Sequence, residues 1–266
     1  MSQDRELTHE NLDLPEYAAS RGARLEGILG RVSDAPLRDG NQIELLKNGP
    51  DTYDHWLAAI ARARRWVHLD NYIFANDEIG NTFAEALSAK AQEGVRVRVL
   101  HDWFGCMNVP RSFWNSMRDA GVEVKAVNPP ASGPPLGAIR RDHRKLVAVD
   151  GEYASTGGVC IADGWMVRSP ETGLPYRDTA VSVRGPVVAD INRAFTSLWG
   201  ELVQELPDDE RPEPTDIQAE GETPARLVVQ EPRRMRTLRM LELLTAGVQE
   251  RLWITDPYFL SMPILT

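Results

Sequence analysis

The sequence predicts an α/β fold, an α/β/α sandwich around a mixed, largely parallel central sheet. Short apolar runs alternate with helix-like runs between residues 41 and 127, as they do where helices connect neighbouring strands. A further apolar run, residues 147–149, leads into Asp150-Gly151, a strong hairpin signal. Hydrophobic residues make up 42% of the 266-residue chain, which is ample for a core.

Residues 41–74 give the first strand, helix and second strand. Residues 43–46 are mostly apolar and precede Asn48-Gly49, a turn signal. Residues 53–65 place Trp56, Leu57 and Ile60 on one face of a helix. Residues 66–74 are nearly continuously apolar and predict a buried strand.

The alternation continues through residue 127. Residues 76–80 are loop-like, residues 81–92 form an amphipathic helix, and Gly94 stops it. Residues 95–100 alternate in the manner of a strand, residues 112–120 indicate a helix, and residues 122–127 a short strand. Beyond the hairpin we expect a strand at 181–183 and an amphipathic helix through Ile191, Phe195, Leu198 and Trp199.

The stretch around residue 143 carries the clearest chemistry. His143, Lys145 and Asp150 form the pattern His-x-Lys-x-x-x-x-Asp. In a strand, alternate residues share a face, so His143 and Lys145 point one way and Arg144 the other. Lys145 can hold the anionic oxygens of a phosphodiester while His143 attacks phosphorus or protonates a leaving oxygen. Asp150 falls on the other face, and we interpret it as a turn carboxylate.

Composition limits the possible partners. The net charge of −9 argues against a broad nucleic-acid footprint. Cys106 and Cys160 form neither a disulfide framework nor a metal-ligand spacing, which indicates a reduced cytosolic setting. The polar N-terminus lacks a signal-peptide pattern, and no stretch reaches the apolar length of a membrane span. We expect His68 to be a hydrogen-bonded core histidine and His101 to support a site at a strand end.

An ordered series of short motifs resembles the phospholipase D superfamily, and within it the bacterial cardiolipin synthases. The series runs from about residue 41 to residue 199 and comprises Asn48-Gly49, residues 70–74, residues 93–97, residues 102–105, the His143/Lys145/Asp150 pattern, Gly157-Gly158, Arg177-Asp178-Thr179 and Gly185-Pro186. Family members consist of two similar α/β halves that each supply one motif. The resemblance implies a covalent phosphohistidine on one histidine and acid/base work by the other, without a metal or organic cofactor.

The resemblance assigns roles to individual residues. It implies that His143 is the nucleophile or the acid/base, and that Lys145 binds the phosphate. Gly157 and Gly158 match the family, and their backbone amides are candidate phosphate ligands. Cys160 stands where the family usually has asparagine, and a thiol is a far weaker donor than a carboxamide. Asp178 is the candidate carboxylate that orients a catalytic imidazole.

The chain divides into four predicted parts. Residues 1–40 are an N-terminal extension, residues 41–206 a first phospholipase D-like half, and residues 207–226 an acidic, Pro-rich and solvated linker. Residues 227–266 begin a second half, because Leu243, Arg251, Asp256 and Tyr258 repeat Leu57, Arg65, Asp70 and Tyr72 at a constant offset. The second repeat is therefore truncated, and the second catalytic motif is absent from this sequence.

The leading expectation is a phosphatidyltransferase of the cardiolipin synthase type that is inactive as this truncated chain. Its expected partners are an anionic phospholipid such as phosphatidylglycerol, the membrane surface, and a missing C-terminal half or a second copy. We expect a cytoplasmic protein, peripheral at the inner membrane. The alternatives are a phospholipase D or phosphodiesterase working as a homodimer, and a non-catalytic phosphate-binding remnant.

Overall fold

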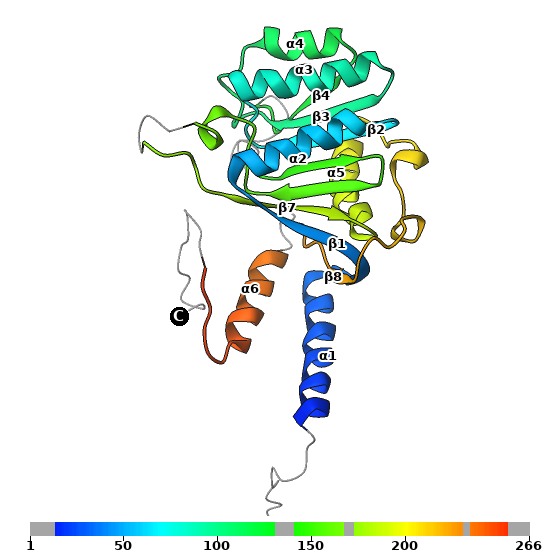
Figure 1. Cartoon of the computed structure of the whole chain (residues 1–266), viewed down its shortest axis with the longest axis vertical. Helices are drawn as coiled ribbons and strands as arrows, with labels where there is room; N and C mark the ends of the chain where they lie inside the picture. The colour runs from blue at the N-terminus through cyan, green and yellow to red at the C-terminus, as the bar shows by residue number, and fades with distance from the viewer. Residues whose placement is uncertain (1–13, 131–140, 168–172, 231–234, 255–266) are drawn as a thin grey trace, which may run out of the picture. The chain divides into compact units, whose positions relative to one another are not determined.

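A mixed β-sheet organises the larger of two units in this computed structural model (Figure 1). The structure describes residues 14–130, 141–167, 173–230 and 235–254, and the larger unit is Arg38–Ala225. Its described strands lie in the order β4-β3-β2-β5-β6-β7-β1-β8. They are β1 (Arg38–Lys47), β2 (Trp66–Asn71), β3 (Arg96–Asp102), β4 (Glu123–Val127), β5 (Lys145–Val149), β6 (Tyr153–Gly157), β7 (Thr179–Arg184) and β8 (Thr223–Ala225). The α/β class and the mixed sheet are confirmed.

The share of parallel pairing is smaller than predicted. Among the described strands, only β2 with β3 and β3 with β4 pair in parallel. The pairs β2–β5, β5–β6, β6–β7, β7–β1 and β1–β8 are antiparallel. Among the described strands, helices connect neighbouring strands only for β2, β3 and β4, whereas a tight turn joins β5 to β6 and forces an antiparallel pair. The alternation of strands and helices in the first half of the sequence therefore predicted more parallel strand pairs than the described sheet contains.

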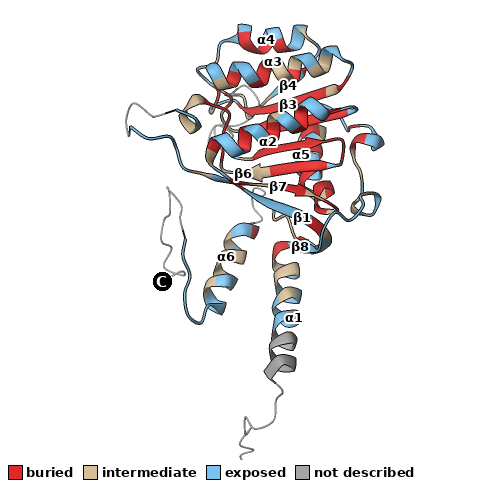
Figure 2. Cartoon of the chain, viewed as in Figure 1, coloured by how far each residue is buried: buried red, intermediate tan, exposed pale blue. Residues whose placement is uncertain are grey.

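Helices cover both faces of the sheet (Figure 1). α2 (Asn48–Arg62), α3 (Glu78–Gln92) and α4 (Arg111–Asp119) lie over one face, and α5 (Val187–Leu202) lies behind it. The first face packs Trp56, Phe83 and Met117 against Val67, Leu69 and their neighbours. Because strand residues alternate, His68 on the second face stacks on Phe195 of α5 at 4.5 Å. Both layers are buried, as the red strands of Figure 2 show.

Two helices begin earlier than their apolar pattern indicated. The predicted turn at Asn48-Gly49 is the start of α2, and Asn48 has a φ of 64° there. A Cβ on Gly49 would overlap the carbonyl of Trp165, so this position requires glycine. Asp77 caps α3 by accepting a hydrogen bond from the Gly80 amide at 2.8 Å. The polar first turns of both helices carry no apolar periodicity, which is why the pattern missed them.

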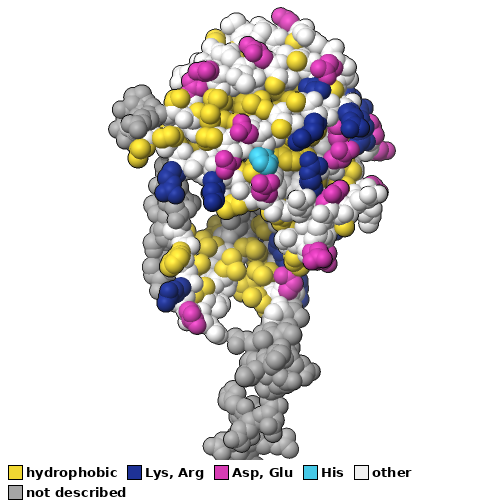
Figure 3. Space-filling model, viewed as in Figure 1, with side chains coloured by type: hydrophobic (Ala, Val, Ile, Leu, Met, Phe, Trp, Pro, Cys, Tyr) yellow, Lys and Arg dark blue, Asp and Glu magenta, His cyan; other side chains and the backbone are white. Residues whose placement is uncertain are grey.

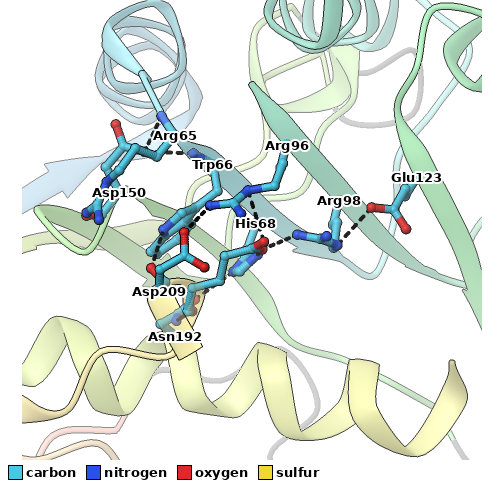
Figure 4. Close-up of polar contacts among 10 residues, drawn as sticks. Arg65, Trp66, His68, Arg96, Arg98, Glu123, Asp150, Asn192 and Asp209 are labelled. Carbon is cyan, nitrogen blue, oxygen red and sulfur yellow. Dashed lines mark hydrogen bonds and ion pairs between the residues drawn. The ribbon is translucent and has the colours of Figure 1, made fainter. Parts of the chain in front are cut away.

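One residue of the acidic segment after α5, Glu210, is buried in the larger unit, whereas most of the segment is exposed. Glu210 has no exposed surface, and its carboxylate pairs with Arg98 and with Arg96 at 3.0 Å. His68 bridges Glu210, at 3.0 Å, and Asn192 of α5, at 2.7 Å (Figure 4). His68 is thus the predicted hydrogen-bonded core histidine, and burial lowers its pKa. The expectation of a solvated charge is wrong at Glu210, because this carboxylate meets cations that lie about 110 residues away in sequence.

The second unit comprises residues 1–37 and 226–266. Its described helices are α1 (Leu14–Ser33) and α6 (Arg236–Gly247). Arg226 ties this unit together through Glu26 and through the Ala35 carbonyl at 3.1 Å. α6 corresponds to the helix of the predicted second repeat, whereas residues 255–266 lie outside the described part of the chain. No described helix has both the length and the apolar character needed to cross a membrane.

Candidate functional site

One end of the sheet gathers the segments that carry the predicted site. β2 and β3 end there at Asn71 and Asp102, and β6 ends there at Gly157. The antiparallel strands β5 and β7 begin there, because Lys145 pairs with Asn71 and Ala180 pairs with Gly157. The edge of a sheet at which several strands end is the usual setting for functional side chains in α/β folds. The topology therefore brings together segments up to about 110 residues apart.

His143 and Lys145 lie together at this end. Lys145 opens β5, and its ammonium donates a 2.7 Å hydrogen bond to the carbonyl of His143. The ammonium also lies 5.0 Å from the ring centroid of Tyr72, and the same ring is 4.5 Å from the imidazole of His143. Arg144 points to the other face, where it donates to the Ala194 carbonyl of α5 at 2.7 Å. The expected opposition of residues 143 and 144 is confirmed.

The surroundings of His143 favour its neutral form. Burial lowers the pKa of His143, and the Lys145 ammonium lowers it further. The carboxylates of Asp102, Asp142 and Asp178 act in the opposite direction but do not reverse the shift. Burial also lowers the pKa of Lys145. A neutral imidazole beside a cation can attack an electrophile that the cation holds.

Two buried polar side chains lie next to Lys145. The thiol of Cys160 is 2% exposed, and burial raises its pKa to about 11 while Lys145 opposes that rise. Asn71 is directly opposite Lys145 in the antiparallel pair, so their side chains share a face. Neither polar atom of the Asn71 carboxamide has a hydrogen-bond partner among the described residues. The sequence pointed to residue 160 through the resemblance, whereas nothing in it singled out Asn71.

Asp178 borders the site but makes no direct hydrogen bond to His143 in this structure. Its Oδ1 accepts from the Thr179 amide at 2.9 Å and its Oδ2 from the indole of Trp165 at 3.3 Å. A Cβ on Gly158 would overlap the Asp178 carboxylate, so this glycine makes room for it. The field of Asp178 raises the pKa of His143. Asp178 is therefore near enough to act electrostatically on the imidazole.

The two glycines have backbone roles. A Cβ on Gly157 would overlap the main chain of Ala180 in β7. The Gly158 amide donates to the Thr179 carbonyl at 3.0 Å, which engages a donor that the resemblance assigned to phosphate. Close approach of β6 to β7 explains Gly157, whereas the Asp178 carboxylate explains Gly158.

A polar clamp that the motif did not indicate holds the segment before β5. Asp102 is fully buried; its Oδ2 accepts from the Asp142 amide at 2.8 Å, and its Oδ1 from the Phe104 and Gly105 amides at 2.9 and 3.0 Å. The Asp142 carboxylate binds the Arg144 guanidinium with two bonds of 2.8 Å. Asp142 and Arg144 flank His143, so the clamp fixes the backbone on both sides of the imidazole.

Asp150 lies at the opposite end of β5 from Lys145. Its carboxylate accepts hydrogen bonds from the amides of Arg64, Arg65 and Trp66 at 2.8 to 2.9 Å. Figure 4 shows the contacts with Arg65 and Trp66. Asp150 and Gly151 both have positive φ, 54° and 74°, in the turn between β5 and β6. The structure thus places Asp150 in a structural position that joins the α2–β2 connection to the hairpin.

The remaining histidines of the described chain are engaged elsewhere. His101 is buried and stacks on Trp114 at 4.0 Å, and burial lowers its pKa to about 4. His55 lies 3.9 Å from Glu44 on the exposed side of α2. No three His, Cys, Asp or Glu side chains in the described residues are arranged to hold a metal ion.

Comparisons with known proteins identify the fold and the family. Residues 56–199, about half the chain, match a family model of phospholipase D-like domains. The chain belongs to the family described as cardiolipin synthase, PLD-like domain. It is 33% identical to cardiolipin synthase A of Pseudomonas putida and 35% identical to that of Pseudomonas fluorescens, each over 96% of this chain and 53% of the relative. The chain thus spans about half the length of these relatives.

A solved structure shares the architecture. The phosphatidylserine synthase of Haemophilus influenzae superposes with a TM-score of 0.54 at 14% identity, covering 86% of this chain and 58% of that one. At this identity the likeness concerns the fold. It confirms the predicted phospholipase D-like fold class.

Proposed function

We propose that this chain supplies one half of a phosphatidyltransferase site of the cardiolipin synthase type. The observation that supports this most is the pairing of His143 and Lys145, joined by the 2.7 Å bond from the ammonium to the His143 carbonyl. They lie at the strand-end edge of a domain whose relatives are named cardiolipin synthases. The donor is an anionic phospholipid such as phosphatidylglycerol, and the protein acts as a peripheral protein at the inner membrane.

The chemistry is a double displacement at phosphorus. In the first step an imidazole nitrogen forms a bond to phosphorus, the bond from phosphorus to the glycerol oxygen breaks, and that oxygen takes up a proton. In the second step the hydroxyl of another phosphatidylglycerol attacks phosphorus, releases the imidazole and loses its proton. Lys145 neutralises the phosphoryl oxygens in both steps. The lowered pKa of His143 keeps its imidazole neutral, as a nucleophile or a general base must be. In either role the reaction needs a second acid/base group.

That second group is a histidine from outside the described residues. His55, His68 and His101 contact other side chains in the described structure. A second half of the same protein, or a second copy of the chain, provides the missing partner. Asn71 supplies a carboxamide beside Lys145, the group that the resemblance leads one to expect at residue 160.

The test is the distribution of lipid products. The complete protein, meaning this chain with whatever continuation its gene encodes, is incubated with labelled phosphatidylglycerol, with and without added short-chain alcohol. Transfer predicts cardiolipin and free glycerol in equal amounts, and a new phosphatidyl ester when alcohol is present. Phosphatidic acid that does not respond to alcohol indicates hydrolysis and contradicts the transferase proposal. Absence of all three lipid products, cardiolipin, the phosphatidyl ester and phosphatidic acid, indicates a phosphate-binding remnant.

A further inference from the structure

Lys145 is a buried cation with few partners. On the face shown in Figure 3, acidic side chains are interspersed with basic ones, so exposed charges there have opposite charges nearby. Lys145, in contrast, is 3% exposed, and within the described chain its ammonium donates one hydrogen bond, to the His143 carbonyl at 2.7 Å. An ammonium has three donors, and a buried charge is costly unless it is paired. Another group must therefore stabilise the charge of Lys145.

The carboxylates whose charge acts on Lys145 are bound to other groups. Asp142 and Asp70 pair with the Arg144 guanidinium at 2.8 and 3.5 Å, and Arg144 points to the opposite face of the sheet. Asp178 accepts hydrogen bonds from a main-chain amide and from an indole. Burial lowers the pKa of Lys145, and these carboxylates oppose that change without reversing it. None of the three forms an ion pair with the ammonium in the described structure.

The other polar neighbours of Lys145 are neutral. Burial raises the pKa of Cys160 to about 11, so its thiol is protonated near neutral pH. Burial and the Lys145 ammonium lower the pKa of His143, so its imidazole is uncharged there too. Asn71, directly opposite Lys145 in the strand pair, carries an uncharged carboxamide. The ammonium therefore lies among groups that do not neutralise it.

The ring of Tyr72 lies against this ammonium. The Nζ atom of Lys145 is over the ring, 5.0 Å from its centroid, and cation–π contacts extend to about 6 Å. The main chain of Tyr72 is held in place, because a Cβ on Gly105 would overlap its carbonyl and the Cys106 thiol donates to the same carbonyl at 3.6 Å. The ring is also 4.5 Å from the imidazole of His143. Tyr72 is thus in contact with both residues of the motif.

We propose that the aromatic ring of Tyr72 takes the place of a counter-ion for Lys145, so that the ammonium stays charged inside the site and keeps this charge for an anionic ligand. Tyr72 is then a positioning residue that acts through Lys145. The inference rests on the proposed function for the identity of the anion, a lipid phosphodiester.

A ring serves this purpose better than a carboxylate does. A carboxylate in the same place would stabilise the ammonium by neutralising it, and would then repel an incoming phosphate. An aromatic ring attracts a cation through its quadrupole and carries no net charge. The positive charge of Lys145 therefore remains available to the phosphoryl oxygens.

The experiment replaces the ring of Tyr72 by rings of similar shape and weaker π-electron density. The pKa of Lys145 is measured in the full chain by NMR titration of its side-chain signal, which is identified by its loss in Lys145→Met. Tyr72→Phe should leave this pKa unchanged. A trifluorinated phenylalanine at residue 72 should lower it by about one pH unit, because fluorine withdraws electron density from the ring face that holds the cation.

Tyr153 provides the matched control. Its ring lies 5.8 Å from the Arg184 guanidinium, and it stands at the opposite end of β6 from the site. The same trifluorinated phenylalanine at residue 153 should leave the pKa of Lys145 as it is in the wild type. Thermal unfolding of all variants checks that they fold. A pKa of Lys145 that is the same with phenylalanine and with trifluorinated phenylalanine at residue 72 overturns the inference, since burial alone then sets it.

Inorganic phosphate tests whether the charge of Lys145 is available to an anion. Its binding is followed through the Lys145 signal in the wild type, in Tyr72→Gln and in Tyr72→Glu, two variants of similar shape that differ by a true counter-ion. The wild type should bind phosphate, and Tyr72→Glu should bind it at least about tenfold more weakly than Tyr72→Gln does. A wild-type signal that does not respond to phosphate, or equal binding by the two variants, overturns the inference.

The outcomes separate this inference from the proposed function, because neither measurement needs turnover. A pKa of Lys145 that falls on fluorination at residue 72, together with a failed transfer assay, would remove the proposed function and retain the role of Tyr72. Normal transfer together with a pKa that does not respond to fluorination would retain the proposed function and remove the role of Tyr72.

Discussion

His143 is surrounded by groups that oppose its protonation, and this gives the site a defined pH dependence. Burial and the Lys145 ammonium lower its pKa, so the neutral imidazole persists below the usual pH range of histidine, about 6.5. We expect NMR titration of His143 to show a midpoint below that value. Lys145→Met should raise the midpoint, because the opposing cation is removed, whereas Lys125→Met on β4 should leave it unchanged.

Comparison with His143→Gln, which lacks the imidazole, identifies the NMR signal of His143. A midpoint of His143 at or above about 6.5, or one that falls in Lys145→Met, would contradict the electrostatic description of the site. The same shift sets the acidic limb of activity, since protonation removes the nucleophile or base. Activity should therefore fall as the pH drops through the lowered pKa and stay constant just above it.

Asn71 provides a second prediction at the scale of one residue. Its carboxamide is buried without a hydrogen-bond partner in the described chain, and an unsatisfied buried amide costs about 1 to 3 kcal/mol. Asn71→Leu should therefore keep or raise the free energy of unfolding by about 1 kcal/mol while lowering phosphatidyl transfer. Denaturant unfolding and product analysis measure the two effects. A variant that loses stability and keeps full activity would assign Asn71 to packing alone.

Single-residue features differed in how far the sequence could predict them. The His143/Lys145 pair follows from strand alternation, a local rule. Asp102, in contrast, acts on Asp142 across 40 residues, and Asn71 meets Lys145 through strand register. Neither relation can be inferred until the strand order is known.

The β5–β6 hairpin and the α2–β2 connection depend on Asp150. Its carboxylate accepts three backbone amides, those of Arg64, Arg65 and Trp66. Asp150→Ala should lower the free energy of unfolding by about 3 kcal/mol, because it leaves these amides without an acceptor. Asp150→Asn keeps one acceptor oxygen and should lose less stability. Folded Asp150→Asn with normal stability and a large loss of kcat would instead indicate a direct catalytic role.

The segment after α5 is held by Glu210. This carboxylate is fully buried against Arg98 and Arg96, and removing one partner of a buried ion pair typically costs about 3 to 5 kcal/mol. We expect Glu210→Gln to destabilise the protein by an amount in this range in urea unfolding. Glu213→Gln is the matched control, since its pair with Arg193 is exposed, and it should change stability by less than about 1 kcal/mol. Equal effects of the two substitutions would show that the Glu210 network does not anchor the segment.

Elements were predicted best where a local pattern specifies them. Periodicity located the main helices and strands of the first half to within a few residues, and Asp150-Gly151 marked the hairpin. The sheet order, the antiparallel majority of its described pairs and the docking of residues 207–216 depend on contacts between distant segments. Composition missed the burial of Glu210 because it counts charges without their partners.

At the scale of the whole molecule, the chain places the proposed half-site at one end of a phospholipase D-like sheet. The chain spans about half the length of the relatives that it matches. Residues 38–225 have their own core and their own site edge. Under the proposed function, a second histidine would complete the chemistry.

The most direct test of the central claim is the transfer activity of His143 variants of the complete protein. Cardiolipin formed from labelled phosphatidylglycerol is measured for the wild type, for His143→Ala and for His55→Ala, which alters an exposed histidine on α2. The account predicts a loss of about 10³-fold or more in His143→Ala, whether His143 acts as nucleophile or as acid/base, and unchanged activity in His55→Ala. Cardiolipin synthesis by folded His143→Ala at the wild-type rate would contradict it.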